Sequence, residues 1–247
     1  MGNNSKIAIV AALEREVHPL VKSWTTERVA CEGKSLRLHS SEKAVVVCAG
    51  MGAAAARRAA GALLERITPS LIISAGFARA LVSDLHVGDV IIPAEVLGIA
   101  TKKSYATLFG AGQLWTSDKV VENSDVPSEL RLFEGKGVDM EAAGVAEVAA
   151  ERRIPFIAVK AISDELTFVM PPVGRFIRQD GGFRTAPFLR YVSVRPKIWR
   201  SVVALAINSS TAATRLCSAL GSLVEHRTVQ GYDLNVELAR LSGGAVR

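Results

Sequence analysis

The chain has 247 residues, a formal net charge of +6 and 49% hydrophobic residues, which suits one α/β domain with a buried core and argues against extensive disorder. Three cysteines without metal or redox spacing, no signal-peptide pattern and no membrane-length apolar run predict a cytoplasmic protein without an integral membrane segment or a bound metal. No nucleic-acid-binding motif accompanies the positive charge, so we expect no nucleic-acid partner.

Short, nearly continuous apolar runs rich in β-branched residues predict strands that are buried on both faces of a sheet. These runs are Ile7–Leu13, Ala44–Cys48, Leu71–Ser74, Pro155–Ile162 and, interrupted by Pro93, Asp89–Ile99. Helical spacing of apolar residues predicts helices over Ala53–Ile67, Glu141–Arg152 and about Pro196–Leu223. The alternation predicts a single α/β domain over residues 1–247, with a mostly parallel central sheet covered by helices on both faces.

The C-terminal third has weaker patterning. Thr167–Tyr191 contains several Gly, Pro and Arg residues without a clear period and predicts a loop or lid, and residues after about 228 predict a loosely ordered tail. Between Pro171 and Arg200, the only acid is Asp180, against seven basic residues: Arg175, Arg178, Arg184, Arg190, Arg195, Lys197 and Arg200. This cluster is either a solvated basic face or a surface for an anionic substrate group or a membrane.

Carboxylates and glycines follow several of the predicted strands. Because ligands of open parallel sheets bind beyond the carboxyl ends of the strands, these residues mark a candidate site. They are Glu16 after the first run, Gly50 after the second, Gly76 and Phe77 after the third, Ser163 and Asp164 after the fourth, and Met140 beside Glu141 at a helix start. Each residue alone could be a helix cap or a turn residue, and their convergence favours a binding site.

Four segments carry a resemblance to a known family. Ile7–Val17, Val45–Ala56, Pro69–Pro93 and Val138–Asp164 resemble the nucleoside phosphorylase/nucleosidase superfamily, and within it the 5′-methylthioadenosine/S-adenosylhomocysteine nucleosidases. The most specific feature is the spacing of VDMEA and AISD in the last segment. The resemblance implies a three-layer α/β/α fold of the nucleoside phosphorylase type, a homodimer or higher homo-oligomer, a small-molecule nucleoside as partner, and no cofactor.

The resemblance also implies roles for single residues. Glu16 would activate water, and Asp164, assisted by Ser163, would protonate purine N7. Glu141 would bind the ribose hydroxyls with Met140 against the sugar, and Gly50, Gly76 and Phe77 would complete the substrate site. The residue types suit the reaction, because breaking the C1′–N9 bond calls for a neutral acid near the leaving base and an ionised carboxylate near water.

The chain departs from the family pattern at two places. In Gly76-Phe77-Ala78-Arg79-Ala80, Phe77 replaces a small polar residue, and Arg79 replaces a glycine. Arg79 is then either a surface side chain or a cation for phosphate. The segment between Pro93 and Val138 is shorter than in the family, and Trp115 within it is either an aromatic contact for the base or a core residue.

These observations predict an enzyme that hydrolyses the N-glycosidic bond of a purine nucleoside resembling 5′-methylthioadenosine or S-adenosylhomocysteine. One alternative is phosphorolysis of a bulky or lipid-linked nucleoside, with phosphate as co-substrate, favoured by Arg79 and the basic stretch. A second alternative is an inactive nucleoside-binding protein in which Phe77 blocks the sugar site.

Overall fold

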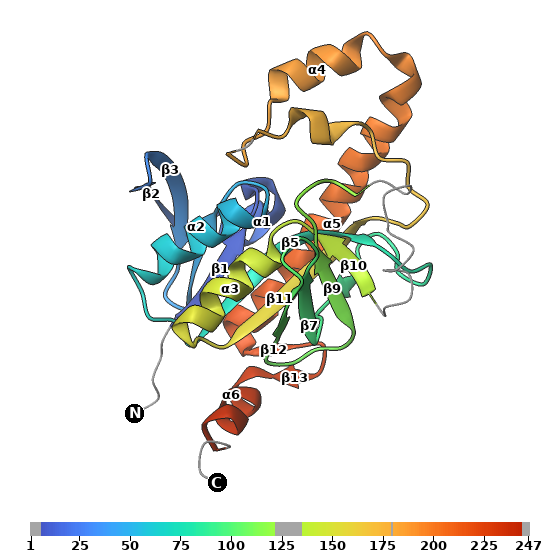
Figure 1. Ribbon diagram of the computed structural model, residues 1–247. Helices are drawn as coiled ribbons and strands as arrows, with labels where there is room; N and C mark the ends of the chain where they lie inside the picture. Colours follow the sequence, from blue (N-terminus) through green and yellow to red (C-terminus); the bar gives the residue numbers. More distant parts are fainter. Residues whose placement is uncertain (1–5, 122–134, 179, 244–247) are drawn as a thin grey trace.

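The computed structural model describes residues 6–121, 135–178 and 180–243 of the chain. Within this part, an 11-stranded sheet has the order β2-β3-β4-β1-β5-β10-β9-β7-β8, with β11 paired to β5 and β6 (Figure 1). The strands are β1 (Ile7–Ala11), β2 (Thr25–Cys31), β3 (Lys34–Ser40), β4 (Ala44–Cys48), β5 (Leu71–Ala80), β6 (Val90–Ile91), β7 (Glu95–Gly98), β8 (Lys103–Ala106), β9 (Gln113–Thr116), β10 (Gly135–Asp139) and β11 (Phe156–Asp164).

The centre of the sheet is parallel. β1 pairs in parallel with β4 and β5, and β5 pairs in parallel with β11. The antiparallel pairs β2–β3, β3–β4 and β7–β8 lie towards the two edges, and β5 also pairs antiparallel with β10 at its C-terminal end, as β11 does with β6. The central strands are those that the apolar runs predicted, because a parallel strand covered on both faces needs apolar residues at nearly every position.

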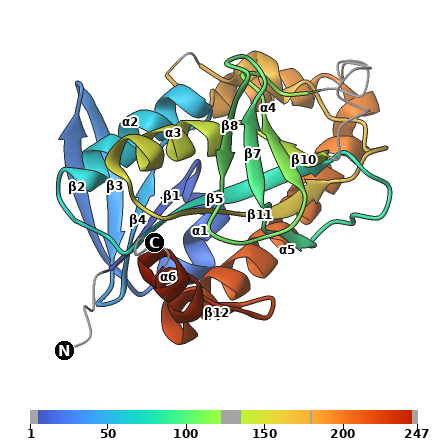
Figure 2. The ribbon, with the colours of Figure 1, turned by 60° about the horizontal axis from the view of Figure 1, so that its bottom comes forward.

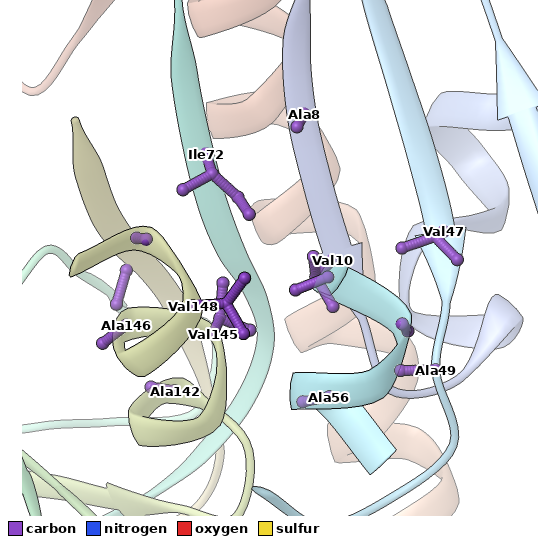
Figure 3. Packing of buried hydrophobic residues seen from close by; sticks show 14 of the residues in the cluster. Ala8, Val10, Val47, Ala49, Ala56, Ile72, Ala142, Val145, Ala146 and Val148 are labelled. Atoms are coloured by element: carbon purple, nitrogen blue, oxygen red, sulfur yellow. The ribbon is translucent and has the colours of Figure 1, made fainter. Parts of the chain in front are cut away.

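Helices cover both faces of the sheet and confirm the predicted three-layer architecture. α2 (Ala53–Leu64) and α3 (Ala142–Arg152) lie on one face, and α1 (Glu14–Val21) and α5 (Trp199–His226) lie on the other. Side chains of β1 alternate between the two cores: Ala8 and Val10 pack with α2 and α3, as Figure 3 shows, whereas Ile7 and Ile9 pack with α1 and α5. This alternation follows from the two-residue period of a strand.

The segment expected to be a loop or lid is partly helical. It contains the 3₁₀ turn η2 (Val173–Phe176) and most of α4 (Thr185–Ser193), and the 3₁₀ turn η3 (Pro196–Ile198) connects α4 to α5. Edge-to-face aromatic contacts join Phe176 to Phe188 and Tyr191, and join Phe183 to Phe188. In Figure 1, α4 and the first turns of α5 project away from the sheet. Among the described helices, none is long and apolar enough to cross a membrane.

The expected loose tail is ordered from Thr228 to Gly243. β12 (Thr228–Val229) pairs with β13 (Tyr232–Asp233), and α6 (Leu234–Gly243) follows. Val229 and Leu234 are buried beside α5, and the Tyr232 ring stacks on Phe109 with centroids 4.6 Å apart. Figure 2 brings this end of the molecule forward. Only a few separated apolar residues hold this segment against the core. A sequence pattern based on periodic apolar residues does not detect such a segment.

Candidate functional site

A cavity of about 860 Å³ opens at the carboxyl ends of the central strands, and six of the eight predicted site residues line it. They are Glu16, Phe77, Met140, Glu141, Ser163 and Asp164. Gly50 and Gly76 are not part of its lining. Parallel strand pairing brings these positions together, since β1, β5 and β11 all end at this edge of the sheet.

Glu16 lies in the first turn of α1, directly after β1. Its side chain is buried, and its Oε2 lies 3.4 Å from the backbone nitrogen of Leu13. A Cβ atom at Gly76 would lie 3.1 Å from the same oxygen, so this glycine leaves the space that the carboxylate occupies. Burial raises the pKa of Glu16 to about 7, against the opposing charge of Lys160. A carboxylate of this kind can accept a proton near neutral pH.

Glu141 is the N-cap residue of α3. The backbone N–H of Gly52 donates to its Oε1 at 2.8 Å, and the N–H of Met140 donates to its Oε2 at 3.3 Å. Burial, and then the charge of Asp139, raise the pKa of Glu141. The glycine turn after β4 thus helps to orient a carboxylate that faces the cavity.

Lys160 is a component of the site that sequence reasoning missed. It is fully buried in β11, where its Nζ lies 2.7 Å from Asp139 Oδ2 and 3.1 Å from Ser74 Oγ. In the β5–β11 register it pairs with Gly76, and its charge lowers the pKa values of Glu16 and Glu141 against the effect of burial. The available signal was a lysine inside the apolar run Pro155–Ile162, since buried lysines occur almost only with a charged partner.

Asp164 is buried at the end of β11 and has two side-chain partners. Ser163 Oγ donates to its Oδ1 at 2.7 Å, and Arg79 Nη1 lies 3.2 Å from its Oδ2. Burial raises the pKa of Asp164, while the hydrogen bond from Ser163 and the charge of Arg79 oppose that increase. The balance leaves a carboxyl group that is more easily protonated than an exposed aspartate.

The expectation that Arg79 could be a surface side chain is wrong. Arg79 is 6% exposed, and the β5–β11 register places it beside Asp164. Its Nη2 also donates to the carbonyl oxygens of Leu166 (3.0 Å) and Phe168 (2.9 Å). The guanidinium therefore joins Asp164 to the segment that follows β11.

Two aromatic residues that were singled out in the sequence have different positions. Trp115 is 2% exposed, packs over Gly135 and does not line the cavity. It is therefore a core residue and not an aromatic contact for the base. Phe77 forms part of the cavity wall and is half-buried. Among the described residues, no group of three or more His, Cys, Asp or Glu side chains could hold a metal ion.

Residues 6–113 and 100–172 match the family model described as the phosphorylase superfamily, and together these segments span more than half of the chain. The chain belongs to the phosphorylase superfamily. Membership confirms the family resemblance of the four sequence segments, all of which lie within the matched residues. The first segment carries Glu16, and the last carries Glu141 and Asp164.

The chain is also similar to individual proteins of known sequence and structure. The 5′-methylthioadenosine/S-adenosylhomocysteine nucleosidase of Glaesserella parasuis is 27% identical over 197 residues, which cover 64% of this chain and 85% of the relative. The structure of the Neisseria meningitidis nucleosidase with methylthio-immucillin-A matches with a TM-score of 0.67 at 19% identity, covering 90% of this chain and 99% of that chain. The Helicobacter pylori futalosine hydrolase matches with a TM-score of 0.67 at 15% identity, with 90% and 98% covered. These matches confirm the nucleoside phosphorylase-like α/β/α fold.

Proposed function

We propose that this member of the superfamily is a nucleosidase that hydrolyses the N-glycosidic bond of a purine nucleoside. The observation that carries the proposal is the convergence of Glu16, Glu141 and Asp164, all buried, on one cavity. The nucleosidase relatives, named for 5′-methylthioadenosine and S-adenosylhomocysteine, support the same reaction class.

In the proposed reaction, water adds its oxygen to C1′ as the C1′–N9 bond breaks. Glu16 takes the proton of that water, which its raised pKa of about 7 allows near neutral pH. Asp164 gives its proton to N7 of the leaving purine, so that the base departs neutral. Ser163 and Arg79 hold the Asp164 carboxyl in position for this transfer.

Glu141 and Lys160 are proposed to act on the sugar side. Glu141 accepts hydrogen bonds from the two ribose hydroxyls, with Met140 against the ring, and its negative charge stabilises the positive charge that develops on the sugar. The buried pair of Lys160 and Asp139 holds a fixed cation near Glu16 and Glu141. That cation favours the ionised forms that these two roles need. No step of this scheme requires a cofactor.

Phosphorolysis has weaker support. The side chain of Arg79, the cation suggested for phosphate, is bonded to Asp164 and to two backbone carbonyls. The N–H groups of Gly50, Met51 and Gly52, which could otherwise cradle a phosphate, donate to Ala12, Gly181 and Glu141. The inactive alternative also has weaker support, because the cavity that Phe77 lines still reaches Glu16, Glu141 and Asp164.

The deciding experiment is an assay of the full chain with 5′-methylthioadenosine and S-adenosylhomocysteine, with and without phosphate. We expect adenine and the free ribose derivative at the same rate in both conditions. Release only with phosphate, together with a ribose 1-phosphate product, would establish phosphorolysis instead. Binding of the nucleoside without turnover across a nucleoside panel would establish the inactive alternative.

The cellular compartment and the oligomeric state are also proposals. All three cysteines are free thiols, which suits the reducing cytoplasm. A homodimer or higher homo-oligomer is expected from the family resemblance, and sedimentation equilibrium of the full chain measures it.

A further inference from the structure

The cavity continues beyond the carboxylates along one side of α5. Seven α5 residues line it at helical spacing: Val202, Leu205, Ala206, Ser209, Ser210, Ala213 and Thr214. A stripe of this length extends for about 18 Å, given the rise of 1.5 Å per residue of an α-helix. The volume of about 860 Å³ lies near the upper end of the range of roughly 300–1,000 Å³ found for small-molecule sites.

The lining changes from polar to apolar along this stripe. The Thr214 end lies next to the catalytic pole, because Cys217 in the next turn donates from its Sγ to the backbone oxygen of Glu16 at 3.4 Å. Three turns away along α5 lie Val202 and Leu205. The segment between β11 and α5 adds further apolar residues to the cavity lining: Met170, Val173, Ile177, Phe183 and Phe188. The cavity therefore suits a ligand that is polar at one end and apolar over a long stretch at the other.

The position of the apolar stretch on a nucleoside follows from the proposed function. Asp164 engages the base, and Glu141 engages the 2′ and 3′ hydroxyls. The 5′ carbon is then the part of the sugar left to carry a further substituent. An apolar group at this carbon can extend along α5 towards Val202 and Leu205.

The cavity is also lined by a part of the chain with an unusual surface, residues 169–178 and 180–207, called the arm below. Of the eight exposed large hydrophobic residues among the described ones, six lie in the arm: Val169, Leu189, Val194, Trp199, Val203 and Ile207. The arm also carries seven exposed basic residues, Arg175, Arg178, Arg184, Arg190, Arg195, Lys197 and Arg200, against the one acid Asp180. It stands off the sheet in Figure 1.

This surface suits an anionic lipid bilayer better than a second copy of the chain. Exposed Trp, Leu and Val side chains flanked by Arg and Lys are typical of segments that lie in the membrane interface. Anionic headgroups attract such a cluster, whereas two copies of the arm would bring like charges together.

We propose that the cavity takes a nucleoside whose 5′ carbon carries a long apolar chain, and that the arm takes this amphiphile from an anionic lipid bilayer. The proposal rests on the nucleosidase function proposed above and specifies its substrate class. The chemistry stays the same: the C1′–N9 bond breaks, and the apolar group remains on the sugar product.

The first test measures adenine release by the full chain from 5′-alkylthioadenosines with chains from methyl to octyl. We expect kcat/KM to increase roughly fourfold with each of the first added methylenes, the factor that corresponds to burial of one CH₂ group. Equal values for methyl and octyl would overturn the substrate class while leaving the nucleosidase function intact. Failure of every analogue to release adenine would instead contradict the nucleosidase function, and calorimetric binding of the octyl analogue would then decide the substrate class alone.

Variants locate the chain-binding part of the cavity. Ala206→Trp, which fills the cavity, and Leu205→Asp, which adds a charge to its wall, should each remove the preference for octyl over methyl. Val236→Asp changes an exposed valine of α6 outside the cavity and the arm and should leave that preference unchanged. An octyl preference that survives in a folded Ala206→Trp variant would place the chain elsewhere.

The second test measures sedimentation of the full chain with vesicles of phosphatidylcholine alone or mixed with phosphatidylglycerol. We expect binding to the mixed vesicles only, weaker at high salt, and reduced at least roughly thirtyfold by the pair Arg190→Glu and Arg195→Glu, since each arginine contributes about 1 kcal/mol. Trp199→Asp should also weaken it, and Val236→Asp should not. Absence of binding, or equal binding to both vesicles, would overturn the bilayer as the source. Dissociation of a dimer by the arm variants would show that a second copy covers the arm.

Discussion

At the scale of single residues, burial raises the pKa values of the three carboxyl groups more than any single partner changes them. Glu16, Glu141 and Asp164 all have raised pKa values, and burial is the largest cause for each. Their partners differ: a lysine charge near Glu16, two backbone N–H groups on Glu141, and Ser163 with Arg79 on Asp164. Residues of one chemical type can therefore serve as base, sugar ligand and acid in one cavity.

Asp164→Asn tests the proposed acid. The substitution keeps the size of the side chain but removes the proton that the leaving purine needs, so kcat should fall by about 10²–10⁴. The neighbouring Glu165→Gln, at a half-buried position outside the cavity, is the matched control and should retain activity. Adenine release at the wild-type rate by the Asn variant would remove Asp164 from this role.

The pH dependence of kcat/KM tests the proposed base. Because Glu16 must be ionised to accept a proton and its pKa is about 7, kcat/KM should decrease as the pH falls below 7. The raised pKa of Asp164 should limit the rate at the alkaline side, where the acid loses its proton. A rate–pH profile of the free enzyme that is flat between pH 5 and pH 7 would contradict the assignment of Glu16.

Glu16→Gln should stabilise the fold while it removes activity. The folded-state pKa of about 7 lies above the ordinary value of 4.5, so the carboxyl is protonated in both states at low pH and the unfolded chain ionises first as pH rises. Stability is therefore lost between about pH 4.5 and pH 7. Urea unfolding should show a gain of roughly 3 kcal/mol for the variant at pH 8 and a gain of less than about 1 kcal/mol at pH 5. The same gain at both pH values would mean that the ionisation of Glu16 is not its cause.

At the scale of secondary-structure elements, the close packing of α2 against α3 positions both the glycine turn after β4 and Glu141, the N-cap residue of α3. α2 and α3 lie side by side on one face of the sheet, and a Cβ atom at Gly144 would lie 2.1 Å from the backbone oxygen of Ala53. The same two helix starts hold Gly52 and Glu141, whose hydrogen bond is 2.8 Å. A displacement of α3 relative to α2 would therefore change the orientation of Glu141.

Gly144→Ala tests this contact. The added methyl group must displace backbone, so we expect a loss of about 1–3 kcal/mol in the free energy of unfolding, together with weaker nucleoside binding. Gly61→Ala in α2 is the matched control, because nothing lies within 4 Å of its added Cβ. That variant should be as stable as the wild type or more stable by roughly 0.5–1 kcal/mol, owing to the higher helix propensity of alanine. Equal effects of the two substitutions would contradict the importance of the contact.

At the scale of the whole molecule, the C-terminal segment 228–243 packs onto the same layers that build the site. The β12–β13 hairpin and α6 bury Val229 and Leu234 in the core that contains Ile7, Ile9 and the buried face of α5. α5 runs from this core to the arm and lines the cavity between them. Loss of the C-terminal segment is therefore expected to weaken the support of α5.

Leu234→Ala tests whether this segment contributes to stability. Leu234 is fully buried, so its truncation should lower the free energy of unfolding by about 2–5 kcal/mol. Leu241→Ala, in the same helix but 54% exposed, should change it by less than about 0.5 kcal/mol. Similar small changes in the free energy of unfolding for both variants would mean that the segment does not contribute to stability, as expected of the loosely ordered tail that the sequence predicted.

Several features could be read from the sequence because they depend on local pattern. The central strands appear as apolar runs, since both of their faces are buried, and Ala44–Cys48 was predicted with the observed bounds of β4. Glu16 and Asp164 were found because they follow such runs, and Glu141 because it lies at the start of a predicted helix. The hairpin β2–β3 and strand β8 have largely exposed or mixed faces and gave no comparable signal. Strand β9 is buried at three of its four residues but is too short to form a clear apolar run.

Sequence alone determined the layered α/β fold, its superfamily and the carboxylates offered at the strand ends, because periodicity and short motifs are properties of neighbouring residues. Only the tertiary structure decided which distant charges meet. The parallel register of β5 and β11 sets Arg79 beside Asp164 and Lys160 beside Gly76, across more than eighty residues of chain. These pairings depend on strand order and register, which are fixed by packing of the whole sheet, and for that reason no local pattern revealed them.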